Sequence, residues 1–236
     1  MKLTLVTLTG ADDSVKPIEL ADMSMKFPFV EWGIFVSLRH QGGFRFPSVE
    51  WIKKLLEIDQ LMNLSVHMCG AIVTDTLQGF GRAFYHYDTL LSKAQRFQLN
   101  FHAEPHSINY SLFQYLLTKY PHEAIFQCDG INDFLLENMP EETKPFCVPL
   151  FDRSHGSGVL PEFWPGTDSI KAKRYGYAGG IGPDNILSVL RSIEKVVSGD
   201  TEIWVDMEAK LRKDNDSVFS MQKVQQVLEQ AEKYYV

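Results

Sequence analysis

Eight short apolar runs, each bounded by turn-forming residues, recur along this chain at intervals of 22 to 34 residues. Buried strands of a parallel sheet have this pattern, because both faces of each strand are covered. An interval of this length accommodates one strand, one helix and two loops. The predicted strands are Leu3–Leu8, Val30–Ser37, Leu64–Cys69, Phe97–His102, Ala124–Cys128, Phe146–Phe151, Arg174–Ala178 and Glu202–Asp206.

Segments with apolar residues at helical spacing lie between these runs, and strands that alternate with helices indicate a parallel sheet. Eight such units favour one closed (β/α)8 TIM barrel, an α/β fold, over the alternative of an open doubly wound sheet. We expect a single domain over residues 1–236, because the sequence shows no linker, repeat or low-complexity tract. The predicted helices are Ser48–Ile58, Ile108–Thr118, Pro183–Val197 and Ser220–Tyr234.

The net charge of −7 and the absence of a basic run argue against nucleic acid and anionic membranes as partners. The three widely spaced cysteines do not suggest a disulfide framework. The first residues are too polar for a signal peptide, and no apolar run reaches the length of a membrane span. These observations predict a cytoplasmic protein, and they leave the oligomeric state open.

Active sites of β/α barrels form at the C-terminal ends of the strands. This rule nominates a set of residues that is rich in ionisable groups. The set is Thr7, Thr9, Ser37, Arg39, His67, Cys69, His102, Glu104, Gln127, Asp129, Asp152, Gly179, Gly180, Asp206 and Glu208.

The segment from Tyr177 to Ile186 indicates a strand, a glycine turn with Gly179, Gly180 and Gly182, and a helix that begins at Pro183. Glycines let the backbone approach a ligand, and unpaired N–H groups at a helix N-terminus attract anions. After the seventh strand of a barrel, this arrangement often holds a phosphate group. A tight turn that binds nothing accounts for the pattern equally well.

Two further loops carry candidate groups. Asp152 ends an apolar strand, and it could act as a general acid if burial or a neighbouring charge raised its pKa. The alternative is that Asp152 accepts backbone N–H groups and caps the loop. The loop from Leu38 to Pro47 holds Arg39 and Arg45 around a Gly-Gly pair, so it could close over an anionic substrate or remain a surface loop.

A third group suggests a metal. Strand alternation places His67 and Cys69 on one side of one strand, and His102 on the next strand could complete a zinc site. A metal-dependent hydrolase is therefore one alternative function. No tight ligand motif supports it, and a histidine in a strand is usually a hydrogen-bonded core residue.

The order of several motifs resembles the phosphoribosylanthranilate isomerase family. The most specific match is Ala178-Gly179-Gly180-Ile181-Gly182-Pro183-Asp184-Asn185-Ile186, which is similar to the family's Ala-Gly-Gly-Leu-x-Pro-Glu-Asn-Val. The other matches are Thr7-Leu8-Thr9-Gly10, Gly33-Ile34-Phe35 with Arg45, Gln98-Leu99-Asn100-Phe101-His102, Asp152 with Ser154, Gly156 and Gly158, and Val205-Asp206. They run in the family's order along nearly the whole chain.

The resemblance implies a cofactor-independent Amadori rearrangement of an aminoaldose phosphate. It implies that Asp152 is the acid, that Arg45 holds a substrate carboxylate, and that Gly179 and Gly180 hold the phosphate. By the same resemblance, Gly182, His102 and Asp206 belong to the substrate site, and a phosphorylated small molecule is the ligand.

The sequence departs from the family at two places. Thr9 stands where the family has a cysteine base, and a threonine hydroxyl cannot act as a base without help; Cys69, His67 or Asp12 could substitute. Glu208-Ala209-Lys210 replaces the family's Ser-Ser-Gly, and the carboxylate would repel a phosphate unless Lys210 or Arg212 offset it. We therefore expect an isomerase-like enzyme with Asp152, Thr9 and Cys69 as catalytic candidates, or a noncatalytic protein that binds a phosphorylated small molecule.

Overall fold

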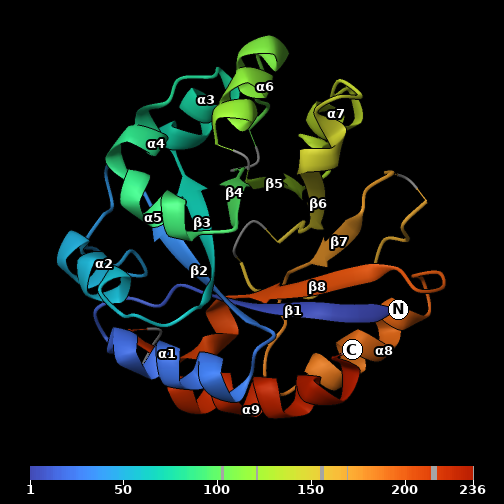
Figure 1. Cartoon of the computed structure of the whole chain (residues 1–236). Helices are drawn as coiled ribbons and strands as arrows, with labels where there is room; N and C mark the ends of the chain where they lie inside the picture. The colour runs from blue at the N-terminus through green and yellow to red at the C-terminus, as the bar shows by residue number, and fades with distance from the viewer. Residues whose placement is uncertain (102–103, 121, 155–156, 169, 214–216, 236) are drawn as a thin grey trace.

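The computed structural model describes residues 1–236 except 102–103, 121, 155–156, 169, 214–216 and 236. Eight parallel strands close into a barrel in the order in which they follow one another along the chain, and β8 pairs with β1 (Figure 1). The predicted eight-stranded β/α barrel is confirmed. Its strands are β1 (Lys2–Thr9), β2 (Val30–Val36), β3 (Asn63–Cys69), β4 (Arg96–Asn100), β5 (Glu123–Cys128), β6 (Cys147–Phe151), β7 (Arg174–Tyr177) and β8 (Glu202–Met207).

Helices surround the barrel and cover the outer face of the sheet (Figure 1). They are α1 (Pro17–Lys26), α2 (Val49–Leu56), α3 (Ala71–Leu77), α4 (Arg82–His86), α5 (Asp88–Lys93), α6 (Tyr110–Lys119), α7 (Asp133–Glu137), α8 (Ile186–Glu194) and α9 (Met221–Ala231). Short 3-10 turns lie at η1 (Lys144–Phe146), η2 (Ala209–Leu211) and η3 (Glu232–Tyr234), and a small antiparallel ribbon joins β9 (Arg212–Lys213) to β10 (Val218–Phe219).

Capping side chains explain where several helices begin. Ser48 accepts a hydrogen bond from the backbone N–H of Trp51 at the start of α2, and Ser220 does the same for Lys223 at the start of α9. The predicted start at Pro183 is wrong, because the N–H of Asn185 bonds to the carbonyl of Gly182 in a turn, and α8 begins only at Ile186.

The connection between β6 and β7 differs from the regular β/α pattern, because its described residues form no helix. The buried side chain of Trp164 packs edge-on against Tyr177, with ring centroids 5.8 Å apart. The hydroxyl of Tyr177 donates to the carbonyl of Pro165 at 3.1 Å. This segment therefore covers its part of the sheet with side chains anchored to β7.

A charged network crosses the barrel interior near the N-terminal ends of β2, β4 and β5. The guanidinium of Arg96 on β4 is fully buried and forms an ion pair with Glu31 on β2, with Nε donating to Oε2 at 2.8 Å. It also contacts Glu123 on β5 at 3.4 Å and lies over the ring of Trp204 on β8. Four strands are thus joined by charge and by cation–π contact in the core.

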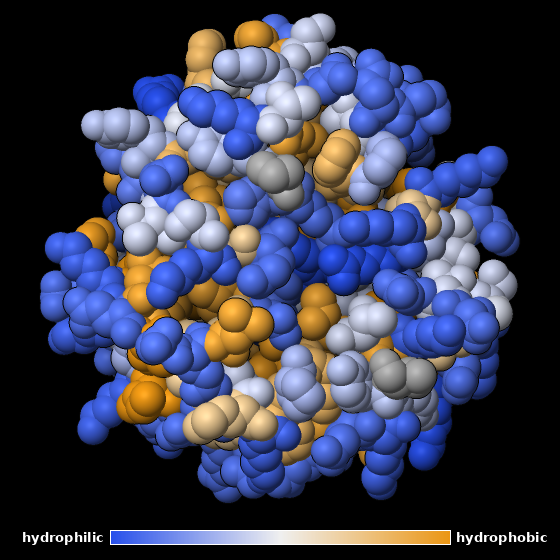
Figure 2. All heavy atoms as spheres, in the orientation of Figure 1, coloured by the Kyte–Doolittle hydropathy of each residue, from blue (hydrophilic) through white to orange (hydrophobic). Residues whose placement is uncertain are grey.

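The outer surface is mainly hydrophilic on the side shown in Figure 2, with apolar side chains interspersed. This fits helices that turn their apolar stripes toward the barrel, such as α8, which buries Ile186, Val189, Leu190 and Ile193. None of the helices in the described part of the chain combines the length and the apolar character that crossing a bilayer requires.

Candidate active site

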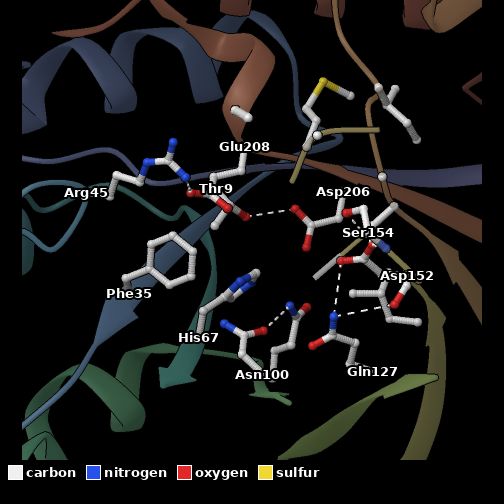
Figure 3. Close-up of a pocket in the computed structure, with 18 of the residues that line it drawn as sticks. Thr9, Phe35, Arg45, His67, Asn100, Gln127, Asp152, Ser154, Asp206 and Glu208 are labelled. Atoms are coloured by element: carbon white, nitrogen blue, oxygen red, sulfur yellow. Dashed lines mark hydrogen bonds and ion pairs between the residues drawn. The ribbon is translucent and has the colours of Figure 1, made fainter. Parts of the chain in front are cut away.

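A cavity of about 280 Å³, close to the size of a small-molecule site, opens at the C-terminal ends of the strands. All eight strands or the loops that follow them contribute side chains or backbone to its wall, so the location agrees with the barrel rule. The lining includes Thr9, Phe35, Arg45, His67, Cys69, Asn100, Gln127, Asp152, Ser154, Gly179, Gly180, Ile181, Asp206, Glu208 and Lys210 (Figure 3).

Thr9 and Asp206 form a hydrogen-bonded pair on adjacent strands. The Thr9 hydroxyl donates to Oδ1 of Asp206 at 2.8 Å, and both residues are buried. Burial raises the pKa of Asp206 to about 8, against the opposing effect of the Thr9 bond, and the negative charges of Glu31, Asp152 and Glu208 raise it further. Near neutral pH this carboxyl therefore holds a proton, although it lies in a cavity open to a ligand.

A glycine on β2 lets two site residues approach each other. A Cβ atom at Gly33 would lie 2.2 Å from Oγ1 of Thr9 and 2.9 Å from Nε2 of His67, so no larger residue fits there with these neighbours. The imidazole of His67 points into the cavity (Figure 3), and neither ring nitrogen has a hydrogen-bond partner within the described residues. Burial and the charge of Arg96 lower the pKa of His67 to about 3, so the ring is neutral and offers one donor and one acceptor.

Cys69 lies on the same strand and keeps its proton. Nδ2 of Asn100 lies 3.2 Å from its sulfur, and burial raises the pKa of the thiol to about 12 despite that contact. A base must be deprotonated at working pH, and a thiolate is the reactive form of cysteine. The environment of Cys69 thus does not suit it to replace the family's cysteine base.

Asp152 faces the cavity and also caps its own loop. Its Oδ1 accepts hydrogen bonds from the backbone N–H of Ser154 at 2.8 Å and from the Ser154 hydroxyl at 2.7 Å. Gln127 donates to Oδ2 at 3.2 Å, and its own side-chain oxygen accepts the N–H of Phe101. The loop-capping alternative raised from the sequence is realised, yet it leaves Asp152 in the cavity wall as a hydrogen-bond acceptor (Figure 3).

The glycine turn after β7 presents its backbone to the cavity. Gly179 and Gly180 have positive φ angles of 106° and 66°, which L-residues rarely adopt. The N–H groups of Gly179, Gly180 and Ile181 donate to no group in the described residues. The N–H of Gly182, by contrast, donates to Oδ1 of Asn185 at 2.9 Å, and Gly182 does not line the cavity.

Lys210 lies directly against this turn. A Cβ atom at Gly182 would lie 2.4 Å from Cβ of Lys210, so the absence of a side chain at 182 gives the lysine its place. Lys210 lines the cavity, and it forms no ion pair with any described residue. One positive charge and three backbone N–H groups therefore lie at the same side of the site.

The sequence suggested Lys210 or Arg212 as the residue that offsets the charge of Glu208. In the structure Arg45 forms an ion pair with Glu208, whereas Arg212 donates to Asp12 at 2.8 Å and to the carbonyl of Gly10 at 2.7 Å. Arg45, to which the family resemblance assigns a substrate carboxylate, thus pairs with a carboxylate of the chain itself.

The structure gathers most of the residues that the sequence nominated. His102 lies outside the described residues. Within the rest, no three histidine, cysteine, aspartate or glutamate side chains are grouped in a way that could hold a metal ion.

Gln98 and Asn100 on β4 also line the cavity, although the sequence did not nominate them as site residues. Two polar side chains that are two residues apart near the end of a buried strand lie on the same face of it, and this pattern is a signal for a cavity wall.

Comparison with solved structures places this barrel among known ones. Phosphoribosylanthranilate isomerase from Thermus thermophilus superposes with a TM-score of 0.59 over 99% of both chains at 14% identity. The Thermotoga maritima isomerase superposes with a TM-score of 0.58 over 98% of this chain and 99% of that one at 10% identity. The chain has the fold of the phosphoribosylanthranilate isomerases.

A third isomerase structure, in complex with reduced 1-(o-carboxyphenylamino)-1-deoxyribulose 5-phosphate, superposes with a TM-score of 0.58 over 98% of this chain and 99% of that one at 12% identity. No protein-family model matches the sequence, and no curated protein sequence matches it. At these identities the likeness to the phosphoribosylanthranilate isomerases establishes the fold, and the reaction has to be argued from the site.

Proposed function

We propose that the protein is an isomerase that acts on a phosphorylated sugar or sugar amine by acid–base catalysis. The observation that carries the proposal is that one cavity is lined by a glycine turn whose N–H groups are unpaired within the described residues, by Lys210 and by a buried carboxyl group whose pKa is raised to about 8. The solved isomerase complex holds an aminodeoxyribulose phosphate, which is the ligand class that such a cavity suits.

The anion-binding side consists of the glycine turn and Lys210. Consecutive backbone N–H groups without a protein partner attract an anion, and Gly179, Gly180 and Ile181 bring three such groups to the wall of the cavity. Asp152 and Glu208 also line this cavity, so backbone dipoles have to hold a phosphate close to negative charge. Lys210 supplies the positive charge that would balance the phosphate.

The proton-transfer side consists of Asp206 and Asp152. In our proposal, Asp206 gives its proton to the ring oxygen while the C1–O bond breaks and the nitrogen lone pair forms a C1=N bond. Asp152 then takes the C2 proton, and the electrons of that C–H bond neutralise the iminium nitrogen as an enaminol. Transfer of the Asp152 proton to C1 and of the enol proton to Asp206 yields the ketone and restores both groups.

This division of labour differs from the one that the family resemblance implies. Asp152 accepts all of its hydrogen bonds, as a carboxylate does, whereas Asp206 is the carboxyl that environment keeps protonated. Neutral His67, with two unpaired nitrogens facing the same space, is suited to hydrogen-bond a substrate hydroxyl.

Thr9 favours a second candidate function. It occupies the position of the family's base, and its hydroxyl proton is donated to Asp206. A protein without that base could bind a phosphorylated small molecule and catalyse nothing. Binding without turnover of any aminoaldose phosphate would favour this candidate over the isomerase.

We expect inorganic phosphate and ribose 5-phosphate to raise the melting temperature, because a ligand that binds only the folded state stabilises it. Lys210→Met should weaken the affinity by about tenfold, the effect of losing roughly 1.4 kcal/mol of charge-assisted binding. Thermal-shift titration measures both effects.

The matched control is Lys213→Met, which removes the same charge from an exposed residue outside the cavity. Equal weakening by both variants would show a general charge effect and remove the support for a local phosphate site. A bulky residue at Gly180 is a poorer test, because its Cβ would lie 2.6 Å from the backbone nitrogen of Leu160 and displace that loop.

A further inference from the structure

Arg45 and Glu208 form an ion pair in the wall of the cavity (Figure 3). Both side chains are about four-fifths buried, with exposed fractions of 21% and 20%. Both also line the cavity, so a ligand meets the pair rather than an isolated guanidinium.

Neighbouring residues hold Arg45 in this position. Its backbone is left-handed, with φ of 67°, which is unusual for a residue other than glycine. Its N–H donates to Oδ2 of Asp12 at 3.1 Å, and the same oxygen accepts Nη2 of Arg212. The ring of Phe44 lies under both guanidinium groups, 5.0 Å from Arg45 and 4.7 Å from Arg212.

The partner carboxylate is placed by the end of β8 and by a glycine. Glu208 directly follows β8 and precedes the 3-10 turn η2. A Cβ atom at Gly10 would lie 3.4 Å from Cγ of Glu208, so the end of β1 leaves room for the glutamate stem. The pair is therefore fixed from three sides: by β1, by the loop after β2 and by β8.

The charge of Arg45 is thus already matched. A ligand carboxylate that approached the guanidinium would have to share it with Glu208, and two carboxylates at one site repel each other. Lys210 lies against the glycine turn after β7, and it forms no ion pair with a described residue. The cavity accordingly suits one anionic group at Lys210 and an uncharged or cationic group at Arg45 and Glu208.

We propose that Glu208 is a specificity-determining residue that directs the site toward phosphorylated sugar amines whose amine substituent carries no carboxylate. This inference rests on the proposed function. It separates the chain from the role that the family resemblance implies for Arg45, which is to hold a substrate carboxylate.

The test compares two probes by isothermal titration calorimetry. One probe is reduced 1-(o-carboxyphenylamino)-1-deoxyribulose 5-phosphate, and the other is the same compound without its carboxyl group. We expect the unmodified protein to bind the decarboxylated probe at least about tenfold more tightly. Glu208→Gln should raise the affinity for the carboxylated probe about tenfold and leave the affinity for the decarboxylated probe nearly unchanged.

Two further variants sharpen the test. Arg45→Met leaves Glu208 without this partner. It should therefore lower the affinity for the carboxylated probe further, which is the opposite of the Glu208→Gln effect. Glu202→Gln removes the same charge from an exposed residue at the other end of β8, and it should leave the ratio of the two affinities unchanged. Circular dichroism spectra that match the unmodified protein show that each variant folds.

The outcomes separate this inference from the proposed function. If both probes bind and Glu208→Gln leaves their ratio unchanged, or if the unmodified protein prefers the carboxylated probe, the role of Glu208 is wrong and the phosphosugar site stands. If neither probe binds the unmodified protein or any variant, the phosphosugar site itself is wrong, and the specificity inference falls with it.

Discussion

Replacing Asp206 with asparagine is expected to lower kcat for the isomerisation by about 10²- to 10⁴-fold, the usual contribution of a positioned general acid or base. Asparagine keeps the shape of the side chain and can still accept the Thr9 hydrogen bond, but it cannot give up a proton. Steady-state kinetics with an aminoaldose phosphate measures the effect. KM should change little, because the phosphate contacts lie elsewhere in the cavity.

The pH dependence gives this prediction a second readout. Because the pKa of Asp206 is about 8, kcat should fall as the pH rises above that value and the acid is lost. Asp200→Asn, an exposed change at the opposite end of the barrel, should alter neither kcat nor the pH profile. An Asp206→Asn variant with unchanged kcat would show that another group supplies the proton.

The same Asp206→Asn variant that loses activity should gain stability at alkaline pH. The pKa of Asp206 is higher in the folded state than its ordinary value of 3.8, so its contribution to stability is complete below about pH 4 and is lost as the pH rises through about 8. The asparagine variant lacks this loss. We expect it to be more resistant to urea than the unmodified protein at pH 8 to 9, whereas a purely structural Asp206 would give a less stable variant.

Arg96→Met is expected to lower the free energy of unfolding by about 3–5 kcal/mol, because it removes the buried cation that pairs with Glu31 and one of the cations that pair with Glu123. Removing one partner of a buried pair costs more than the pair itself contributes. Urea denaturation at pH 7 measures the loss, which corresponds to roughly 10 °C in Tm for a chain of this size.

Two comparisons identify the cause. Arg174→Met removes a partly exposed partner of Glu123, which keeps Arg96 and Lys173, and should cost much less, about 1 kcal/mol. Adding Glu31→Gln to Arg96→Met should recover part of the loss, since it removes the uncompensated charge. If the free energy of unfolding of the Arg96→Met single variant lies within about 1 kcal/mol of that of the unmodified protein, water or protonation compensates the buried carboxylates.

The strands could be predicted from the sequence because a parallel barrel buries both faces of each strand, which leaves continuous apolar runs such as those of β2 and β5. Helix boundaries were less predictable. The short helices α3, α4 and α5 carry no long amphipathic stripe, and the start of α8 depends on the turn in which Gly182 and Asn185 bond to each other.

The location of the site followed from strand order, but the roles of its residues did not. The pKa of Asp206 depends on burial and on charges contributed by three other strands or loops, and none of these is visible in the motif Val205-Asp206. The pairing of Arg45 with Glu208 joins residues 163 positions apart. Such contacts arise from three-dimensional packing, so a one-dimensional pattern could nominate these residues but could not pair them.

The close approach of Thr9 and His67 to Gly33 also limits how this site can change over evolutionary time. Any side chain at position 33 would overlap both Thr9 and His67, so a mutation there is tolerated only after the other two positions have become smaller. Substitutions at these three positions are therefore epistatic, and their order matters. A lineage that fixed Gly33 first could afterwards explore different proton-transfer groups at position 9, whereas a lineage with a larger residue at 33 could not accommodate this histidine.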